Sequence, residues 1–260
     1  MEQASLLSER RGPILSLTLN RPHRLNALDH ELRQSIADAI ESANGDPEIR
    51  VLTFTGTGTH AFSAGQDLHE SGALKPADGP VWMAGWVRYF SAFARATKPL
   101  IMAVNGVAAG GGLETALLGD LRIASRNARF LMAEADIGLP AIVGQHLLKI
   151  HLGLSRATEL VLTARTLNAG EAHEIGLLHR VVDESDLPEA AAEMARHLAE
   201  KPPLAMQLTV GRFREVLLPA LANAEQASAR YQSEAVASGE PQQAMQAFLA
   251  RRQRRQSVDA

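Results

Sequence analysis

An apolar run that leads into three consecutive glycines constrains the fold of this chain more than any other feature. The run "LIMAV" covers residues 100–104, and the glycines are Gly110, Gly111 and Gly112. After them the apolar spacing is that of a helix, with Glu114 one turn inside. A strand that is apolar throughout usually has both faces covered. The stretch therefore predicts a buried strand followed by a glycine-rich turn into a helix.

Two interpretations of these glycines remain open from this stretch alone. Backbone N–H groups at a helix N-terminus have no partner within the helix, and the helix dipole favours negative charge there. Glycines would let a carbonyl oxygen approach the backbone closely and accept those hydrogen bonds, which is the arrangement of an oxyanion hole. Small residues would also permit tight packing of the helix against a strand, because such glycine-rich turns serve both purposes.

A second stretch offers a similar corner. "HAFSAGQDL", residues 60–68, follows a predicted strand at 51–55 and places Gly65 before Gln66 and Asp67. This corner is able to present another backbone N–H, and two such corners together would clamp one oxygen atom. An ordinary polar turn is the alternative interpretation, because these residue types are also typical of turns.

Two glutamates complete the candidate site. Glu114 lies three residues beyond Gly111, and Glu134 follows a short apolar run that predicts a strand end. If both face one pocket, they repel each other and at least one holds its proton more tightly, which suits acid–base chemistry on a water molecule. The alternative is that either is a surface residue, as most glutamates are, and periodicity does not decide between the two.

The composition excludes several classes of protein. The chain has 260 residues, 46% hydrophobic and 21% charged, which is typical of a soluble globular protein. Its net charge of −3 gives no general attraction to nucleic acid. Cysteine is absent, which excludes disulfides, thiolate nucleophiles and zinc–thiolate sites. The charged N-terminal residues 1–13 predict neither a signal peptide nor a membrane span, and we expect a cytoplasmic protein.

The first part of the chain has the pattern of a mixed α/β body. Strands are predicted at 14–20, 51–55 and 100–104, with shorter ones near 121–124 and 129–132. Between the first two, Asp29 is a candidate N-cap for a helix that ends at Asn44-Gly45.

Helices dominate beyond about residue 155. Ser155 is a candidate cap for one helix, Asn168 with Glu171 for a second, and Pro188 suits the first turn of a third. We expect an α/β region over residues 1–195 and a helical region over 196–260. The histidines His146 and His151 lack the spacing that presents two ligands on one helix face, so no metal site is predicted.

Together these motifs resemble the crotonase family, also called the enoyl-CoA hydratase/isomerase superfamily. The resemblance covers essentially the whole chain and rests on the order and spacing of the motifs. They are "LNRPHRLNAL" (19–28), "FSAGQDL" (62–68), "AVNGVAAGGGLETALLGD" (103–120), "ARFLMAEADIGL" (128–139), "SRATELVLTARTLNAGEAHEIGLLHRVV" (155–182) and "AMQAFLARR" (244–252).

The resemblance implies a fold and an assembly. The fold is a spiral of ββα units with a helical C-terminal region that packs homotrimers, often as dimers of trimers. By this resemblance, residues 1–195 form the spiral core and residues 196–260 the oligomerisation region. The substrate class it implies is an acyl-CoA thioester, with no cofactor other than the coenzyme A of the substrate.

The resemblance also implies site residues. The backbone N–H groups of Gln66 and Gly111 match the family's oxyanion hole, and Glu114 and Glu134 match the two catalytic glutamates of the hydratases. The backbone of Ala64 would help to hold the adenine. The residues expected to contact the CoA thioester are Arg24, Ala64, Gln66, Asp67, Gly110 and Gly111.

Because both glutamates are present, the resemblance favours syn hydration of a trans-2-enoyl-CoA to a 3-hydroxyacyl-CoA. One alternative is a double-bond isomerase that uses Glu134 alone, and another is a non-catalytic acyl-CoA-binding protein. The segment "LPAIVGQHLL", 139–148, departs from the family's Pro-Gly-rich pattern, and Ile142 stands where dienoyl isomerases carry an aspartate. Trp82 and Trp86 either wall an acyl pocket or pack in the core, where apolar helical stripes usually lie.

Overall fold

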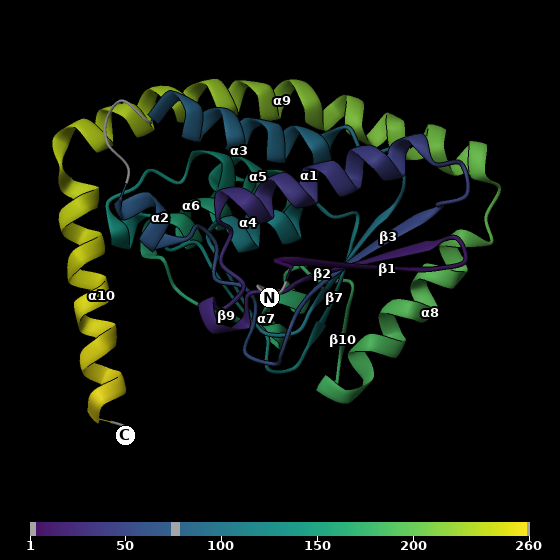
Figure 1. Ribbon diagram of the computed structural model, residues 1–260, viewed down its shortest axis with the longest axis horizontal. Coiled ribbons are helices and arrows are strands. Elements are labelled where there is room, and N and C mark those ends of the chain that lie inside the picture. The colour runs from purple at the N-terminus through teal and green to yellow at the C-terminus, as the bar shows by residue number, and fades with distance from the viewer. Residues whose placement is uncertain (1–3, 74–78, 259–260) are drawn as a thin grey trace.

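A six-stranded sheet forms the centre of the fold (Figure 1). The computed structural model describes residues 4–73 and 79–258. The strand order is β1-β2-β3-β5-β7-β10, with β1 and β2 antiparallel and the remaining neighbours parallel. The strands are β1 (Leu6–Arg11), β2 (Ile14–Leu19), β3 (Val51–Gly56), β5 (Leu100–Val104), β7 (Leu121–Ser125) and β10 (Arg180–Val182).

A smaller sheet lies beside it and completes a spiral of ββα units. Its order is β4-β6-β8-β9, with β4, β6 and β8 parallel and β9 antiparallel to β8. Each turn of the chain visits both sheets, because β3 leads to β4, β5 to β6, and β7 to β8, and a helical segment follows each pair. The expected α/β spiral is therefore confirmed. The strands are β4 (Ala61–Ser63), β6 (Val107–Ala109), β8 (Arg129–Leu131) and β9 (Leu167–Asn168).

Helices surround the two sheets. None of those in the described part of the chain combines the length and apolar character needed to cross a lipid bilayer. Short 3₁₀ turns are η1 (Pro22–Arg24), η3 (Ala135–Ile137) and η4 (Glu184–Asp186). The helices are α1 (His30–Gly45), α2 (Leu68–Gly72), α3 (Gly79–Ala94), α4 (Gly111–Leu118), α5 (Ile142–Leu152), α6 (Leu154–Thr163), α7 (Ala169–Glu174), α8 (Leu187–Ala199), α9 (Pro203–Ser238) and α10 (Glu240–Val258).

Strand β5 is buried on both faces, as its apolar sequence predicts. All five of its residues are buried. Ile101 and Ala103 pack into a cluster with α8, whereas Leu100, Met102 and Val104 join the larger core on the other face. This double burial fixes the β5–β6 unit that leads into α4, because neither face is free to shift against solvent.

The C-terminal helices fold back over the rest of the chain. In Figure 1 the long α9 extends over α3, and it also packs on α5. Helix α10 then descends past α2 and contacts η3. The expected division at residue 195 falls inside α8, and as a boundary between domains it stays a prediction.

Two helix caps are confirmed and one is wrong. The carboxylate of Asp29 accepts a hydrogen bond from Leu32 N at the start of α1, and the Asn168 side chain accepts one from Glu171 N at the start of α7. Ser155 does not cap α6, because that helix begins directly after Gly153, the residue that ends α5, and Ser155 lies inside its first turn.

Strand β1 was not predicted from the sequence. Its residues, "LLSERR", include three charges and show no alternation of apolar and polar side chains. Five of its six residues are exposed, since β1 is the edge strand and is held by backbone pairing to β2. Charged side chains on an edge strand also discourage pairing with another chain.

Candidate active site

A cavity of about 640 Å³ brings together residues from distant parts of the chain. Both glycine corners, the two glutamates, the aromatic face of α3 and the start of α5 line it. Helices α9 and α10 also contribute, through Ser228, Gln232 and Phe248. Nothing in the sequence pattern of α9 indicated these contacts, because they depend on the C-terminal helices folding back over the site.

The Gln66 corner connects β4 to α2. Leu28 N donates to Gly65 O at 2.7 Å and Asp67 N donates to Leu28 O at 3.2 Å, so Leu28 and Gln66 form a parallel β-bridge. In such a bridge the N–H of Gln66 itself points away from Leu28. Gly65 has φ +84°, and a Cβ there would lie 2.4 Å from Ala109 O. Only glycine allows this turn to approach the β6–α4 segment so closely.

The second corner places Gly111 next to Gln66. Helix α4 begins at Gly111, and Gly110 precedes it. A Cβ on Gly111 would lie 3.6 Å from Gln66 N and 3.0 Å from Cη2 of Trp86. Among the described residues, neither the Gln66 N–H nor the Gly111 N–H donates to a protein acceptor. Two adjacent backbone donors therefore remain for a ligand at the cavity wall.

Gly112 accounts for the packing interpretation of the glycine run. A Cβ at this position would lie 2.2 Å from the backbone oxygen of Ser63 in β4. Hydrogen bonds also hold the first turn of α4. Thr115 Oγ1 donates to Gly111 O at 2.7 Å, and it lies 2.7 Å from the hydroxyl of Tyr89 on α3. The glycine run thus provides close packing at Gly112 and an open backbone at Gly111.

Glu114 is buried in the cavity wall. Glu114 is 8% exposed. Its Oε1 lies close to Gly144 at the start of α5, because a Cβ added to Gly144 would be 3.0 Å from this oxygen. Burial raises the pKa of Glu114 well above its usual value, and the nearby Glu134 raises it further. The backbone N–H of Gly144 acts in the opposite direction and lowers the pKa.

Glu134 approaches the same cavity from the turn after β8. A Cβ on Gly110 would lie 2.7 Å from Glu134 Oε1, so this carboxyl group lies over the backbone of the second corner. Its Oε2 is fully buried and has no hydrogen-bond partner among the described residues. Burial raises the pKa of Glu134 to about 7, against a smaller opposing effect of its own backbone N–H.

The two glutamates therefore titrate as a pair. Both pKa values are raised, and part of the increase for Glu114 comes from the charge of Glu134. Near neutral pH such a pair holds a proton that one carboxyl donates while the other accepts. The arrangement is able to move protons to and from a water molecule held between the two groups.

Three further residues that the resemblance implicates also line the cavity. Arg24 is exposed in η1 and Ala64 is half-buried in the first corner, and both line the cavity. Asp67 also lines it, but its side chain is 6% exposed and its carboxylate is bound by Arg21 and by backbone N–H groups of α2. The side chains of the basic run 251–255 lie outside the described residues.

Trp82 and Trp86 serve both of the roles considered for them. They line the cavity, and Trp86 is also 6% exposed and part of the core. Trp86 stacks on Phe90 with ring centroids 5.4 Å apart, and the guanidinium of Arg33 lies 4.4 Å from its ring centroid. One wall of the cavity is therefore a rigid aromatic surface. Across the described residues, no group of three or more His, Cys, Asp or Glu side chains is placed to hold a metal ion.

Known proteins are similar to this chain in sequence and in fold. The 1,2-epoxyphenylacetyl-CoA isomerase of Escherichia coli K12 is 36% identical over 252 residues, covering 95% of this chain and 96% of that protein. The short-chain-enoyl-CoA hydratase of Clostridium acetobutylicum is 35% identical over 210 residues, 80% of each chain. A crystal structure of an enoyl-CoA hydratase/isomerase from Mycobacterium paratuberculosis superposes with a TM-score of 0.88 at 26% identity, over 94% of this chain and 98% of that one.

A family model agrees with these relatives. Residues 9–256 match the model of the enoyl-CoA hydratase/isomerase family, which is nearly the whole chain. The spiral fold described above agrees with this family, because the solved structure from Mycobacterium paratuberculosis has the same fold. The chain belongs to the enoyl-CoA hydratase/isomerase family, the crotonase superfamily.

Proposed function

We propose that this enzyme adds water in the syn sense across the double bond of a trans-2-enoyl-CoA, giving a 3-hydroxyacyl-CoA. One observation carries the proposal: two buried glutamates with raised pKa values share a cavity with two backbone N–H groups that have no acceptor in the part of the chain that the structure describes. The similarity to the short-chain-enoyl-CoA hydratase of Clostridium acetobutylicum supports it.

The two backbone donors activate the thioester. Its carbonyl oxygen lies between the N–H groups of Gln66 and Gly111 and accepts a hydrogen bond from each. When water adds to the β-carbon, negative charge moves through the conjugated system onto this oxygen, and the two donors stabilise the resulting enolate. One such donor commonly lowers a barrier by about 3–4 kcal/mol.

The glutamate pair moves the protons. Glu114 and Glu134 hold one water molecule, and the ionised member takes its proton as the oxygen forms a bond to the β-carbon. The protonated member supplies the proton that the α-carbon gains when the enolate collapses. Both groups act from one side of the substrate, which gives syn addition, and the atoms balance without a metal or a redox cofactor.

The substrate lies across the cavity from its mouth to its aromatic wall. Arg24 is placed to meet the negative phosphates of CoA, and the backbone of Ala64 to meet the adenine. The contribution of Asp67 is indirect, because its carboxylate already has partners within the protein. The acyl chain extends toward Trp82, Trp86 and the segment 139–148.

The direct test is turnover of crotonyl-CoA, followed by the loss of absorbance of its conjugated thioester. We expect the wild-type enzyme to be active and the variants Glu114→Gln and Glu134→Gln each to lose about 10²-fold or more in kcat. Glu189→Gln, which changes an exposed glutamate on α8, is the control and should retain full activity. Wild-type rates in both cavity variants would refute the proposal.

An isomerase is the second candidate, favoured by the similarity to the 1,2-epoxyphenylacetyl-CoA isomerase over 95% of the chain. The isomerisation proposed for this chain is a double-bond shift, unlike the epoxide isomerisation in that relative's name, and in it Glu134 alone would move a proton between two carbons of a 3-enoyl-CoA. The same variants separate the candidates, because Glu114→Gln would then retain most of its activity on 3-enoyl-CoA. Binding of CoA thioesters without turnover of any enoyl-CoA would instead indicate a non-catalytic acyl-CoA-binding protein.

The proposed assembly is a homotrimer or a dimer of trimers. Among the described residues of α9, four aliphatic or phenylalanine side chains belong to residues that are at least 65% exposed, and a protein surface usually covers such a group. Two further exposed leucines lie on α6. The six residues, with exposed fractions between 62% and 75%, are Leu154, Leu162, Leu204, Leu208, Phe213 and Val216.

A further inference from the structure

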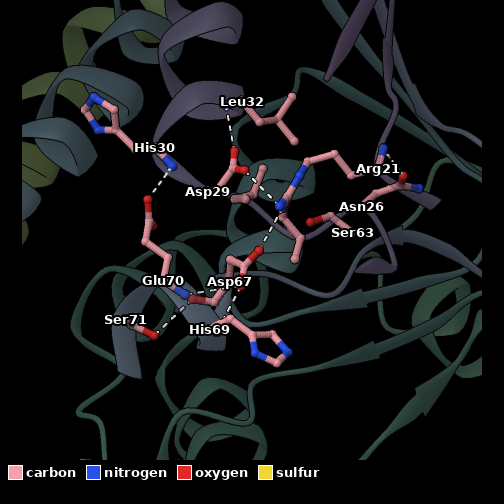
Figure 2. Close-up of polar contacts among 12 residues, drawn as sticks. Arg21, Asn26, Asp29, His30, Leu32, Ser63, Asp67, His69, Glu70 and Ser71 are labelled. Carbon is pink, nitrogen blue, oxygen red and sulfur yellow. Dashed lines mark hydrogen bonds and ion pairs between the residues drawn. The ribbon is translucent and has the colours of Figure 1, made fainter. Parts of the chain in front are cut away.

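Arg21 pairs with Asp29 and with Asp67, the residue directly after Gln66 (Figure 2). Its guanidinium pairs with Asp67 Oδ2 at 2.9 Å and with Asp29 Oδ2 at 2.8 Å, and it donates to Ala27 O at 2.6 Å. The Arg21 side chain is 15% exposed. We propose that Arg21 is a positioning residue that holds the Gln66 N–H toward the cavity. This inference rests on the proposed function.

The direction of the Gln66 N–H depends on the β-bridge to Leu28. The peptide units on both sides of Gln66 are hydrogen-bonded to Leu28, so the N–H of Gln66 is left facing the opposite side, toward Gly111. A single bridge of two hydrogen bonds is weak by itself, since no longer strand continues it. Further contacts join the same two segments on either side of the bridge: Ala64 N donates to Leu25 O at 2.9 Å, and His30 N donates to Glu70 Oε1 at 2.7 Å.

Arg21 adds a contact at the bridge itself, because it binds the residue next to Leu28 and the residue next to Gln66. Ala27 O, next to Leu28, lies on one side, and the carboxylate of Asp67, next to Gln66, lies on the other. The guanidinium is planar and rigid, so its contacts fix the distance and orientation between the two segments. Arg21 thus fastens the bridge without itself lining the cavity.

Asp67 transmits this constraint to the corner. Its Oδ1 accepts hydrogen bonds from His69 N and Glu70 N at the start of α2, while its Oδ2 binds Arg21 (Figure 2). Burial alone would raise the pKa of Asp67, but Arg21 and the α2 backbone outweigh it and lower the pKa. The residue directly after Gln66 is therefore an ionised carboxylate held at both oxygens.

Loss of the guanidinium would release this arrangement. Asp67 would remain buried with one oxygen unpaired, and it would seek water or another donor by moving the 66–67 peptide. Since a displacement of about 1 Å at a reacting group can cost about 10²-fold in rate, a small rotation of the Gln66 N–H is enough to matter.

The test measures polarisation of a bound carbonyl without turnover. A cinnamoyl-CoA with a 4-dimethylamino group absorbs at longer wavelength when its thioester oxygen accepts strong hydrogen bonds, so its absorption maximum reports the oxyanion hole directly. The spectrum is compared for the wild type, Arg21→Gln and Asp67→Asn. Arg165→Gln is the matched control, because Arg165 also pairs with two carboxylates, Glu159 and Glu171, on the surface.

We expect the wild type and Arg165→Gln to show the same red shift, and Arg21→Gln to lose most of it. Its kcat on crotonyl-CoA should fall by about tenfold or more, while KM changes by less than about threefold. Should Arg21→Gln fail to fold, Asp67→Asn decides the matter, because its amide oxygen can still accept from α2 while an NH2 donor replaces the Oδ2 acceptor that binds Arg21.

The possible results separate this inference from the proposed function. A folded Arg21→Gln or Asp67→Asn protein with the full wild-type shift and kcat would overturn the positioning role and leave the hydratase proposal intact. If the wild-type protein binds the probe without any shift of its absorption maximum, the proposed oxyanion hole is itself refuted. A loss of shift that is as large in Arg165→Gln would also overturn it, because the effect would then not be specific to the corner.

Discussion

At the scale of single residues, the cavity places two glutamates where charge is costly. Glu114 and Glu134 are both removed from water, and this burial raises the pKa of each carboxyl group. Active sites commonly accept such a cost in stability because the same environment gives the group its reactivity. The pair therefore links function to a measurable dependence of stability on pH.

Neutralising Glu134 should stabilise the protein at alkaline pH. Its pKa is about 7 when folded against an ordinary 4.5, so the native state binds a proton more tightly and the free energy of unfolding falls as pH rises between these values. Urea unfolding at pH 8 should give Glu134→Gln about 1–3 kcal/mol more stability than the wild type, and the gain should vanish near pH 4. Glu189→Gln should show no such gain. An unchanged or lower stability of Glu134→Gln at pH 8 would contradict the account.

The sequence predicted the candidate site as far as local spacing reaches. Glu114 lies within one turn of Gly111, and Gln66 follows its own glycine, so each corner could be proposed from its neighbours. Arg21 was missed as a contributor because its partner Asp67 lies 46 residues away. Gln232 was missed because its packing against Pro140 depends on the path of α9.

At the scale of secondary structure elements, the β6–α4 corner combines a strand end, a glycine turn and a short buried helix. All eight residues of α4 are buried, so the helix has no polar face that would identify it as an amphipathic helix. Its position is set by contact with β4 on one side and by the Thr115–Tyr89 pair on another. These contacts hold the β6–α4 corner in place, so the backbone N–H of Gly111 stays directed at the cavity.

Adding one methyl group at Gly112 should disrupt this corner. The new Cβ would lie 2.2 Å from Ser63 O, a backbone atom that cannot move without shifting β4. Gly112→Ala should therefore lower the free energy of unfolding by about 3 kcal/mol and reduce kcat. Gly211→Ala is the opposite case: the site lies inside α9 with open space around it, so a gain of about 0.5–1 kcal/mol is expected. Equal stability of Gly112→Ala and wild type in urea unfolding would contradict this packing.

The elements that the sequence predicted are those whose signals are local. Alternation identified β2, continuous apolar character identified β5, and the caps at Asp29 and Asn168 identified two helix starts. The strands β4, β6 and β9 have only two or three residues each, too few for a periodic pattern. They exist because the spiral brings them beside one another.

At the scale of the whole molecule, the spiral and the C-terminal helices together enclose the site. The two corners come from successive turns of the spiral, and α10 contacts both α2 and η3, the segments that follow Asp67 and Glu134. Gly138 lies close to the first residues of α10, because a Cβ added to it would be 3.1 Å from backbone atoms of Glu240 and Pro241. One chain therefore supplies the corners, the glutamates and part of the cover.

The exposed apolar side chains of α9 lead to a prediction about the oligomeric state. Sedimentation should give a mass of three chains or a multiple of three, because the exposed apolar side chains need a partner surface. Replacing Leu204 and Leu208 together by glutamate should reduce the assembly to monomers, whereas Leu7→Glu on the edge strand β1 should leave it intact. A wild-type protein that stays monomeric at all concentrations would contradict the proposed trimer.

A structure with a bound acyl-CoA tests the central claim most directly. The measured quantities are the distances from the thioester oxygen to Gln66 N and to Gly111 N, and from the β-carbon to the two glutamates. We expect both N–O distances to be about 2.7–3.1 Å, with the β-carbon facing Glu114 and Glu134 across the space of one water molecule. A thioester oxygen that contacts only one of the two amides, or none, would contradict the account.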